Sequence, residues 1–399
     1  MKILFVNTLY APFRVGGAEV SVQTMAEGFA AAGNQVYVLT LGYEESVRKM
    51  NGVIIVTIKT KNLYHIEKAG GQNFIKKMIW HLLDSANVFY RQKLRAILDR
   101  IKPDVVNTNN IQGFSPYLWK VVKSRNIKLV HTLRDYYMLC HATTMYTKCG
   151  DCQQLCTACK LTWSIKKKYF KLPDAYVGIS KFILDQHAEF NIGLNVPTRV
   201  IANGISPLDG PPPAIKAPAN EVVLGFIGKV NEQKGVDFLF SELAKIATHT
   251  PFRLVVAGKA SPDFQAMLTE KYQGSFAFTF MGKVDPKSFY AGIDLVIVPS
   301  AWNEPFGRVP IEAVAAYTPV CLAYKAGLKE LYNEAQMWRF DMEENSLSVL
   351  LKPILDDPTV IARKSAACAG LQNYYSPALL NQQLADFIDT IHDRSEGIY

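Results

Sequence analysis

Two glutamates in the second half of the chain, Glu304 and Glu312, lie eight positions apart in the stretch WNEPFGRVPIEAVAA. Gly307 permits a tight turn, and Pro310 suits the first position of a helix, where its missing N–H has no partner. The amides from Phe306 to Val309 would then point outward at the helix start and attract an anion. A carboxylate beside such a site needs hydroxyl donors, which ribose and sugars supply. The stretch therefore predicts a site for phosphate and hydroxyl groups together.

A second glycine-rich loop supplies cations. Lys229 and Lys234 lie between Gly228 and Gly235, directly after the apolar run VVLGFIG. Two ammonium groups neutralise a diphosphate and the charge it gains as a leaving group, although lysines on a loop are often only solvated. Gly16-Gly17 opens a helix-like segment in the first half, where backbone amides can approach an anion. Its spacing is not G-x-G-x-x-G, so a dinucleotide fingerprint is not met.

Strand-like and helix-like segments alternate along the chain and must position these loops. In the first half, strands are expected at 2–8, 35–41, 53–58, 104–109 and 127–133, with helices at 18–33, 91–102 and 115–125. After a Pro, Gly and Ala-rich linker at 200–221, strands are expected at 222–228, 252–258, 276–282, 295–300 and 320–324, with helices at 235–247 and 311–317. This alternation predicts an α/β fold with parallel sheets. We expect two Rossmann-like domains, 1–205 and 206–399, that face each other across a cleft, with the last helix packing back on the first domain.

The charge is distributed unevenly. The net charge is +9, but residues 1–200 hold 27 Lys and Arg against 13 Asp and Glu, and residues 201–399 hold 17 against 22. A basic first half favours an anionic partner: a nucleic acid, a phosphorylated substrate or an acidic membrane surface. The basic residues would alternatively serve solubility alone. No apolar run reaches about 18 residues, and the start reads as a buried strand, so we expect a cytoplasmic protein.

These motifs, in this order, resemble the retaining family 4 glycosyltransferases of the GT-B fold over nearly the whole chain. The resemblance is carried by GGAEVSVQTMAEGFAAAGNQVYVLT, NGI at 203–205, GFIGKVNEQKGVDFLF, LVVAGKA, FMGKV and the E-x7-E motif EPFGRVPIE. It implies that Glu312 binds the ribose of a nucleotide-sugar and that Glu304 binds a hydroxyl of its sugar. The residues that it implies for the diphosphate, the nucleobase and the surrounding donor site are Lys229, Lys234, Gly16, Gly17, Gly228, Lys283, Val284, Phe306, Gly307 and Arg308.

The resemblance also implies a mechanism. Retention in this family is described as attack from the side of the departing phosphate, which helps to remove the acceptor proton, so no protein nucleophile is obligatory. No D-x-D motif for a divalent cation is present. Many members carry a His-Asp pair after a strand of the first domain, where this chain has Arg134-Asp135. Arginine cannot act as a general base, so Arg134 either clamps a phosphate or carboxylate or forms an ion pair with Asp135. Lys229 stands where arginine is usual, which keeps the charge but not the bidentate geometry.

Five of the seven cysteines fall between residues 140 and 159. Cys149, Cys152, Cys156 and Cys159 have the spacing C-x2-C-x3-C-x2-C, and Cys140 lies upstream. Paired C-x2-C motifs in a cytoplasmic protein favour a metal, with structural zinc the simplest interpretation and an iron–sulfur cluster another. Free thiols or disulfides in a loop are the alternative.

Two basic and aromatic stretches, 73–100 and 164–171, are typical either of segments on an anionic membrane or of ordinary amphipathic helices. The membrane interpretation predicts a lipid-linked saccharide acceptor. We expect a metal-independent hexosyl- or related transferase that takes a UDP- or GDP-sugar, serves cell-envelope polysaccharide or lipopolysaccharide biosynthesis and binds no nucleic acid. The alternatives are another enzyme on the same fold, such as a nucleotide-sugar epimerase or a phosphorylase, and a non-catalytic protein that binds an anionic ligand.

Overall fold

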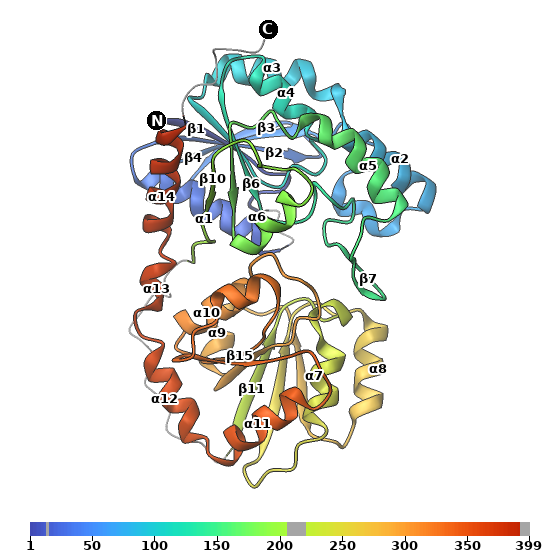
Figure 1. The fold of residues 1–399 in the computed structure, drawn as a ribbon, viewed down its shortest axis with the longest axis vertical. Coiled ribbons are helices and arrows are strands. Elements are labelled where there is room, and N and C mark those ends of the chain that lie inside the picture. Colours follow the sequence, from blue (N-terminus) through green and yellow to red (C-terminus); the bar gives the residue numbers. More distant parts are fainter. Residues whose placement is uncertain (13–15, 206–220, 392–399) are drawn as a thin grey trace. The chain divides into compact units, whose positions relative to one another are not determined.

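The computed structural model describes residues 1–12, 16–205 and 221–391. The chain forms two compact units. The first unit contains Met1–Met145, Cys152–Gly204 and Pro377–Tyr399, and the second contains Tyr146–Asp151 and Ile205–Ser376. Each unit is built on its own largely parallel sheet with helices (Figure 1), so the predicted fold class is confirmed. None of the described helices combines the length and the apolar composition that crossing a bilayer requires.

The sheet of the first unit has the strand order β10-β9-β6-β5-β1-β2-β4-β3. All neighbours in it are parallel except β3 and β4. Its strands are β1 (Lys2–Val6), β2 (Gln35–Gly42), β3 (Ser46–Met50), β4 (Val53–Lys59), β5 (Val105–Thr108), β6 (Lys128–Leu133), β9 (Ala175–Gly178) and β10 (Thr198–Val200). The five strands expected from continuous apolar runs are β1, β2, β4, β5 and β6, as is usual for strands covered on both faces.

The helices of this unit follow or precede those strands. They are α1 (Gly17–Ala31), α2 (Phe74–Ser85), α3 (Arg91–Ile101), α4 (Tyr117–Lys123), α5 (Thr157–Lys166), α6 (Lys181–Ala188) and α14 (Pro377–Thr390), with 3-10 turns η1 (Ile66–Gly71), η2 (Val88–Tyr90) and η3 (Lys167–Tyr169). The last of them, α14, belongs to this unit although it comes from the other end of the chain, and it packs against α1.

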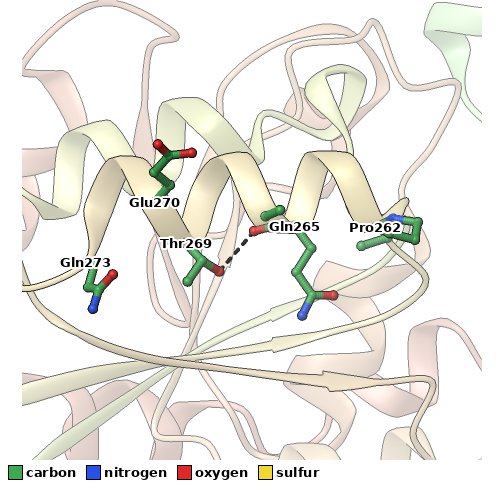
Figure 2. A pocket seen from close by; sticks show the side chains of 7 residues that line it. Pro262, Gln265, Thr269, Glu270 and Gln273 are labelled. Atoms are coloured by element: carbon green, nitrogen blue, oxygen red, sulfur yellow. Dashed lines mark hydrogen bonds between the residues drawn. The ribbon is translucent and has the colours of Figure 1, made fainter.

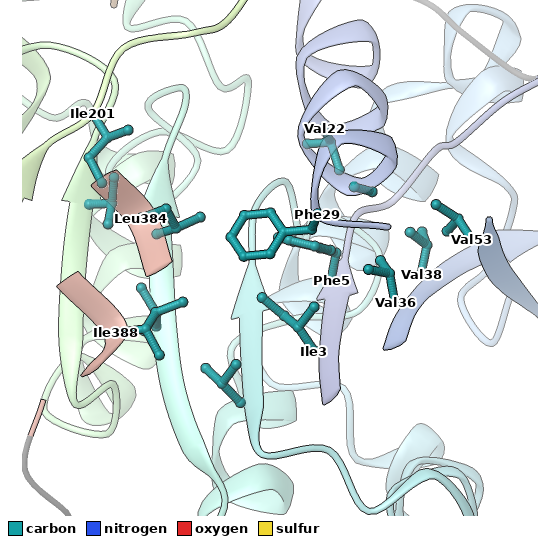
Figure 3. Close-up of a cluster of buried hydrophobic side chains, with 14 of the residues drawn as sticks. Ile3, Phe5, Val22, Phe29, Val36, Val38, Val53, Ile201, Leu384 and Ile388 are labelled. Carbon is teal, nitrogen blue, oxygen red and sulfur yellow. The ribbon is translucent and has the colours of Figure 1, made fainter. Parts of the chain in front are cut away.

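A hydrophobic core of the first unit lies where α1 and α14 cover the sheet (Figure 3). Phe5 of β1 meets Phe29 of α1 with ring centroids 5.6 Å apart. Leu384 and Ile388 of α14 complete this cluster, and both are nearly inaccessible to solvent. Burying such side chains contributes about 1.5 to 3 kcal/mol each, which explains why the chain returns to its first unit.

The sheet of the second unit is fully parallel, in the order β13-β12-β11-β14-β15-β16. Its strands are β11 (Val222–Ile227), β12 (Phe252–Ala257), β13 (Ala277–Gly282), β14 (Leu295–Val298), β15 (Val320–Ala323) and β16 (Met337–Phe340). Its helices are α7 (Val236–Leu243), α8 (Pro262–Tyr272), α9 (Pro286–Ala291), α10 (Arg308–Ala315), α11 (Ser346–Asp356), α12 (Thr359–Ala367) and α13 (Leu371–Tyr374), with 3-10 turns η4 (Glu232–Lys234) and η5 (Ala326–Leu331). From β11 the chain builds the sheet first toward β13 and then from β14 outward. The carboxyl ends of β11 and β14 are therefore the switch point at which such sheets bind ligands.

One local prediction is wrong, and one short hairpin has no counterpart among the expected strands. Helix α10 begins at Arg308, so Pro310 is its third residue and not its first, and Glu312 lies beyond the first turn. A short hairpin of β7 (Tyr146–Thr147) and β8 (Gly150–Asp151) was not expected, and it belongs to the second unit although it lies within the predicted first domain.

Candidate functional site

The site in the second unit is built where the loops after β11 and β14 meet. Gly235 ends the first loop with φ +70°, and a Cβ at this position would overlap the carbonyl oxygen of Pro299. The Trp302 amide in the second loop also donates to the carbonyl of Gln233 at 3.1 Å. Only glycine allows this close approach, which places Lys234 beside the loop that carries Glu304.

The central pair of the site is Lys234 and Glu304. The Lys234 Nζ donates to Glu304 Oε1 at 2.8 Å and also lies 5.2 Å from the ring centroid of Trp302. The Glu304 side chain is only 9% exposed, whereas that of Lys234 is 27% exposed. A buried carboxylate needs such a partner, because desolvation of an unpaired charge is costly. The structure thus brings together the two residues to which the sequence assigns a sugar hydroxyl and a diphosphate.

A second ion pair lies on α10. Arg308 and Glu312 are four residues apart, and the Arg308 guanidinium approaches Glu312 Oε1 at 2.8 Å. The Tyr290 hydroxyl donates to Glu312 Oε2 at 3.4 Å. Burial and the negative charge of Glu312 raise the pKa of Tyr290, which therefore remains a donor. This pairing follows from the early start of α10, because Arg308 and Glu312 then share one helix face.

The other predicted donor-site residues line the same edge of the sheet. Lys229 is exposed after β11, and Lys283 is exposed after β13, with half-buried Val284 next to it. The ends of these strands are held together, since the Gly258 amide donates to the carbonyl of Gly282 at 2.6 Å and the Gly228 amide to that of Ala257 at 3.0 Å.

The α10 turn exposes little more than its backbone. The Phe306 side chain is buried and packs on Tyr375 with ring centroids 6.2 Å apart. Gly307 has φ +94°, and a Cβ there would overlap the Leu328 side chain. A ligand at this helix start would therefore meet mainly main-chain atoms.

In the first unit, Arg134 and Asp135 follow β6. The Arg134 Nε donates to Asn109 Oδ1 at 2.7 Å, and Nη1 donates to Asn203 Oδ1. Arg134 is buried. Asp135 accepts a hydrogen bond from the Tyr137 amide at 2.8 Å, and burial raises its pKa to about 6. Arg134 is therefore held by Asn203 of the NGI motif and by Asn109, which sequence reasoning did not single out.

Gly16 and Gly17 lie at the start of α1, and residues 13–15 before them are outside the described range. The Gly16 amide donates to Glu19 Oε2 at 2.8 Å. The negative charge of Glu19 also contributes to the raised pKa of Asp135, so the start of α1 and the end of β6 are close. An anion at Gly16 would compete with the Glu19 carboxylate for this amide.

A buried charged cluster beneath Asp135 was missed from the sequence. Lys166 is 2% exposed, donates from Nζ to the Tyr137 carbonyl at 2.6 Å and lies 3.6 Å from the Tyr137 ring centroid. Burial lowers its pKa to about 8, and burial raises the pKa of Asp84 to about 6. Within the run SIKKKYFK, Lys166 is buried whereas Lys167 and Lys168 are exposed, so the basic surface expected of this stretch does not include Lys166. The end of α5 turns this one lysine inward.

The cysteines are arranged differently from the predicted metal site. Cys159 contacts Cys140 and Cys156, and its Sγ lies 3.2 Å from His141 Nδ1. Cys149 is exposed and lies in the second unit. Over the ranges that the structure describes, no group of three or more His, Cys, Asp or Glu side chains is placed so that it could hold a metal ion. A structural zinc on Cys149, Cys152, Cys156 and Cys159 is therefore not supported by this geometry and stays a prediction.

A shallow depression of about 640 Å³ lies along α8 (Figure 2). It is lined by Pro262, Gln265, Thr269, Glu270 and Gln273 together with two alanines. The Thr269 hydroxyl is engaged within the helix, donating to the Gln265 carbonyl at 2.9 Å. None of the predicted site residues borders this depression, so it is not the candidate site.

Comparison with known families gives a consistent result for both halves of the chain. The model of "Glycosyltransferase Family 4" matches residues 15–207, and that of "Glycosyl transferases group 1" matches residues 221–348. An uncharacterized 42.6 kDa protein in the cps region of Klebsiella pneumoniae is 33% identical over 338 residues, which cover 83% of this chain and 87% of that protein. An uncharacterized glycosyltransferase of Methanocaldococcus jannaschii is 25% identical over 388 residues, which cover 90% of each chain.

Solved structures share the fold. Sucrose-phosphate synthase from Thermosynechococcus elongatus aligns with a TM-score of 0.75 over 97% of this chain and 98% of its own, at 18% identity. HepE of Anabaena in complex with UDP aligns with a TM-score of 0.69 over 98% of this chain and 100% of its own, at 18% identity. WaaG, a glycosyltransferase involved in lipopolysaccharide biosynthesis, aligns with a TM-score of 0.67 over 97% of this chain and 100% of its own, at 18% identity. At these identities the likeness shows a common GT-B architecture.

Proposed function

Since this chain belongs to the family 4 and group 1 glycosyltransferases of the GT-B type, we propose that it moves a sugar from a nucleoside-diphosphate sugar to a saccharide acceptor. The observation that carries the proposal is the Lys234–Glu304 pair at the switch point of the second sheet. In this proposal Lys234 meets the diphosphate and Glu304 meets a sugar hydroxyl, and their direct contact supports a shared site for the two groups.

The proposed reaction retains the configuration at the anomeric carbon. Lys234 and Lys229 neutralise the diphosphate as its bond to the anomeric carbon breaks, and the amides at the start of α10 add to this stabilisation. Glu304 accepts a hydrogen bond from the sugar, which fixes the anomeric carbon relative to the leaving oxygen. The acceptor oxygen bonds to that carbon from the same side, and the departing phosphate oxygen takes the acceptor proton. No protein nucleophile and no divalent cation enters this scheme, in keeping with the missing D-x-D motif.

The donor is a UDP- or GDP-sugar in this proposal, with UDP supported by the complex of HepE with UDP. We expect a thermal-shift panel of UDP, GDP, ADP and CDP sugars to give a stabilisation selective for one base and unchanged by Mg²⁺ or EDTA. Product analysis by NMR should show the donor's anomeric configuration in the new linkage. No shift with any of these nucleotides would refute the proposal, and an unlinked, isomerised sugar would identify an epimerase.

Glu312 gives a sharper test of nucleotide binding. The E312Q variant removes the charge of the carboxylate that both pairs with Arg308 and is proposed to accept from the ribose, so we expect the Kd for the nucleoside diphosphate to rise about tenfold or more. Isothermal titration calorimetry measures this directly. E343Q, at an exposed position of the same unit, is the matched control and should bind as the wild type does. Unchanged affinity in E312Q would remove Glu312 from the site.

The acceptor side is proposed to lie on an anionic membrane. Four apolar side chains of α2 are exposed: Phe74, Ile75, Met78 and Ile79. Lys76 lies between them, and the neighbouring helix α5 adds exposed Lys160 and Leu161. An apolar stripe with lysines at its border is typical of a helix at a lipid interface. We therefore propose a lipid-linked saccharide acceptor and a peripheral position on the cytoplasmic face of the membrane. A role in envelope polysaccharide or lipopolysaccharide assembly belongs to the same proposal, and the part of WaaG in lipopolysaccharide biosynthesis supports that role.

Vesicle flotation tests this surface. We expect the wild type to bind vesicles with anionic phospholipid and to bind less at high salt, because exposed charges are then screened. Replacing Ile75 with glutamate should lower the partition coefficient about tenfold or more, since an apolar contact is lost and a repulsive charge is added. Val349→Glu is the control, because Val349 is similarly exposed on α11 of the other unit. Equal binding of the two variants would refute the membrane assignment.

A further inference from the structure

Asp151 makes contacts that no sequence motif predicts. It ends strand β8 of the hairpin, yet both of its carboxylate oxygens are engaged by residues about 150 positions further along the chain. Oδ1 accepts a hydrogen bond from the Asn303 amide at 2.9 Å, and Oδ2 accepts one from Lys325 Nζ at 2.7 Å. The Asp151 side chain is 13% exposed. Two charge-assisted contacts on a largely buried carboxylate make a defined attachment.

These contacts close the loop that leads into Glu304. Lys325 Nζ also donates to the Ala301 carbonyl at 2.6 Å, so Asp151 and Lys325 together hold both ends of the turn Ala301–Asn303. Glu304 follows immediately, and its own backbone is bonded to Trp302 and Gly327. The direction in which the chain enters Glu304 is therefore set in part by the Asp151 carboxylate.

We propose that Asp151 is a positioning residue for Glu304: its hydrogen bond to the Asn303 amide and its ion pair with Lys325 hold the carboxylate of Glu304 where it meets the donor sugar. The inference rests on the proposed function, because it assigns Glu304 to that sugar. Asp151 touches no reacting atom. It acts through the backbone of the Ala301–Asn303 turn, so its effect is expected on the sugar and not on the nucleotide.

Amide hydrogen exchange tests the structural half of the proposal without any substrate. In the D151A variant the Asn303 amide loses its acceptor, and we expect its exchange to accelerate about tenfold or more, while D151N, which keeps an acceptor oxygen, stays closer to the wild type. Asp341, an exposed aspartate of the same unit, supplies the control variant D341A, which should leave the exchange unchanged. Unchanged protection of Asn303 in D151A would overturn the proposal even if the protein proved to have another activity.

Kinetics tests the functional half once the wild type shows transfer. We expect D151A to lower kcat/KM for the nucleotide-sugar between tenfold and a hundredfold, with affinity for the bare nucleoside diphosphate and the melting temperature within error of the wild type. D151N should recover part of the loss. In an E304Q background the further effect of D151A should fall below threefold, because the residue that it positions has already been impaired. A full and independent loss in that background, or a parallel loss of nucleotide affinity, would overturn the positioning role.

Discussion

Replacing Lys234 with methionine is expected to reduce kcat/KM for sugar transfer about a thousandfold. Lys234 is the cation at the switch point, and it contacts Glu304 at 2.8 Å, so a donor diphosphate bound there would lose its nearest neutralising charge as it departs. Removing one preorganised electrostatic contact to a leaving group or oxyanion costs about 2.7 to 4 kcal/mol, which is a hundredfold to a thousandfold in rate. The rate is measured by chromatography as the amount of nucleoside diphosphate released per unit time, with the acceptor at saturating concentration.

The same variant leaves the buried Glu304 carboxylate without its lysine, so folding must be separated from catalysis. The double variant K234M/E304Q removes both charges and is expected to recover the melting temperature but not the activity. K352M is the surface control, because Lys352 pairs with Asp356 on exposed α11 at 2.7 Å, and it should keep full activity. Transfer at a wild-type rate by well-folded K234M would refute the site assignment.

The second large effect concerns stability. Replacing Lys166 with methionine removes a buried cation whose charge lowers the pKa of both Asp135 and Asp84, against the effect of burial. Breaking a buried charge network by removing one member costs about 3 to 5 kcal/mol. For a unit of this size, at about 2 to 4 °C per kcal/mol, we expect the melting temperature to fall by roughly 6 to 20 °C at pH 7.5. K168M, at an exposed lysine two residues away, should melt within about 1 °C of the wild type.

The pH dependence of that loss has a definite sign. The raised pKa of about 6 means that the folded state binds protons on Asp84 and Asp135 more tightly than the unfolded chain does, so ionisation between about pH 4 and 6 lowers stability. Without Lys166, ionisation of Asp84 and Asp135 costs the folded state more free energy, because the nearby positive charge is gone. The lysine itself, with a pKa of about 8, is mostly charged at pH 5 and at pH 7.5 and so changes this comparison little. Calorimetry should therefore show a larger deficit for K166M at pH 7.5 than at pH 5, and equal deficits would contradict the network.

Much of the fold could be predicted because it depends on local pattern. Continuous apolar runs such as KILFV and LVIV are the signature of strands covered on both faces, and each became a central strand. The chemistry of the second unit was visible for the same reason, since Glu304, Glu312 and the two lysines lie in short loops directly after such strands. In a parallel sheet those loops must meet at one edge.

What could not be predicted depends on contacts between distant segments. Lys166 sits in a run of three lysines, and nothing in the run marks it as the one that packs under Tyr137. Helix α10 starts two residues before the predicted place because Gly307, with φ +94°, already provides the turn. The cysteine spacing pairs Cys159 with Cys156, and the structure adds contacts of Cys159 with Cys140 and His141 that the C-x2-C pattern does not contain.

The sequence by itself determined the two parallel sheets, the glycosyltransferase family and the loops that carry the central pair, because periodicity and glycine placement are encoded within short segments. The tertiary structure alone decided that Lys234 pairs with Glu304, that Arg308 pairs with Glu312, and that Asp151 attaches to the turn before Glu304. The sequence offers many Lys, Arg, Asp and Glu residues and does not say which of them form pairs. Tertiary packing selects the pairs, because a buried carboxylate needs a partner and can use only one that the folded backbone brings within reach.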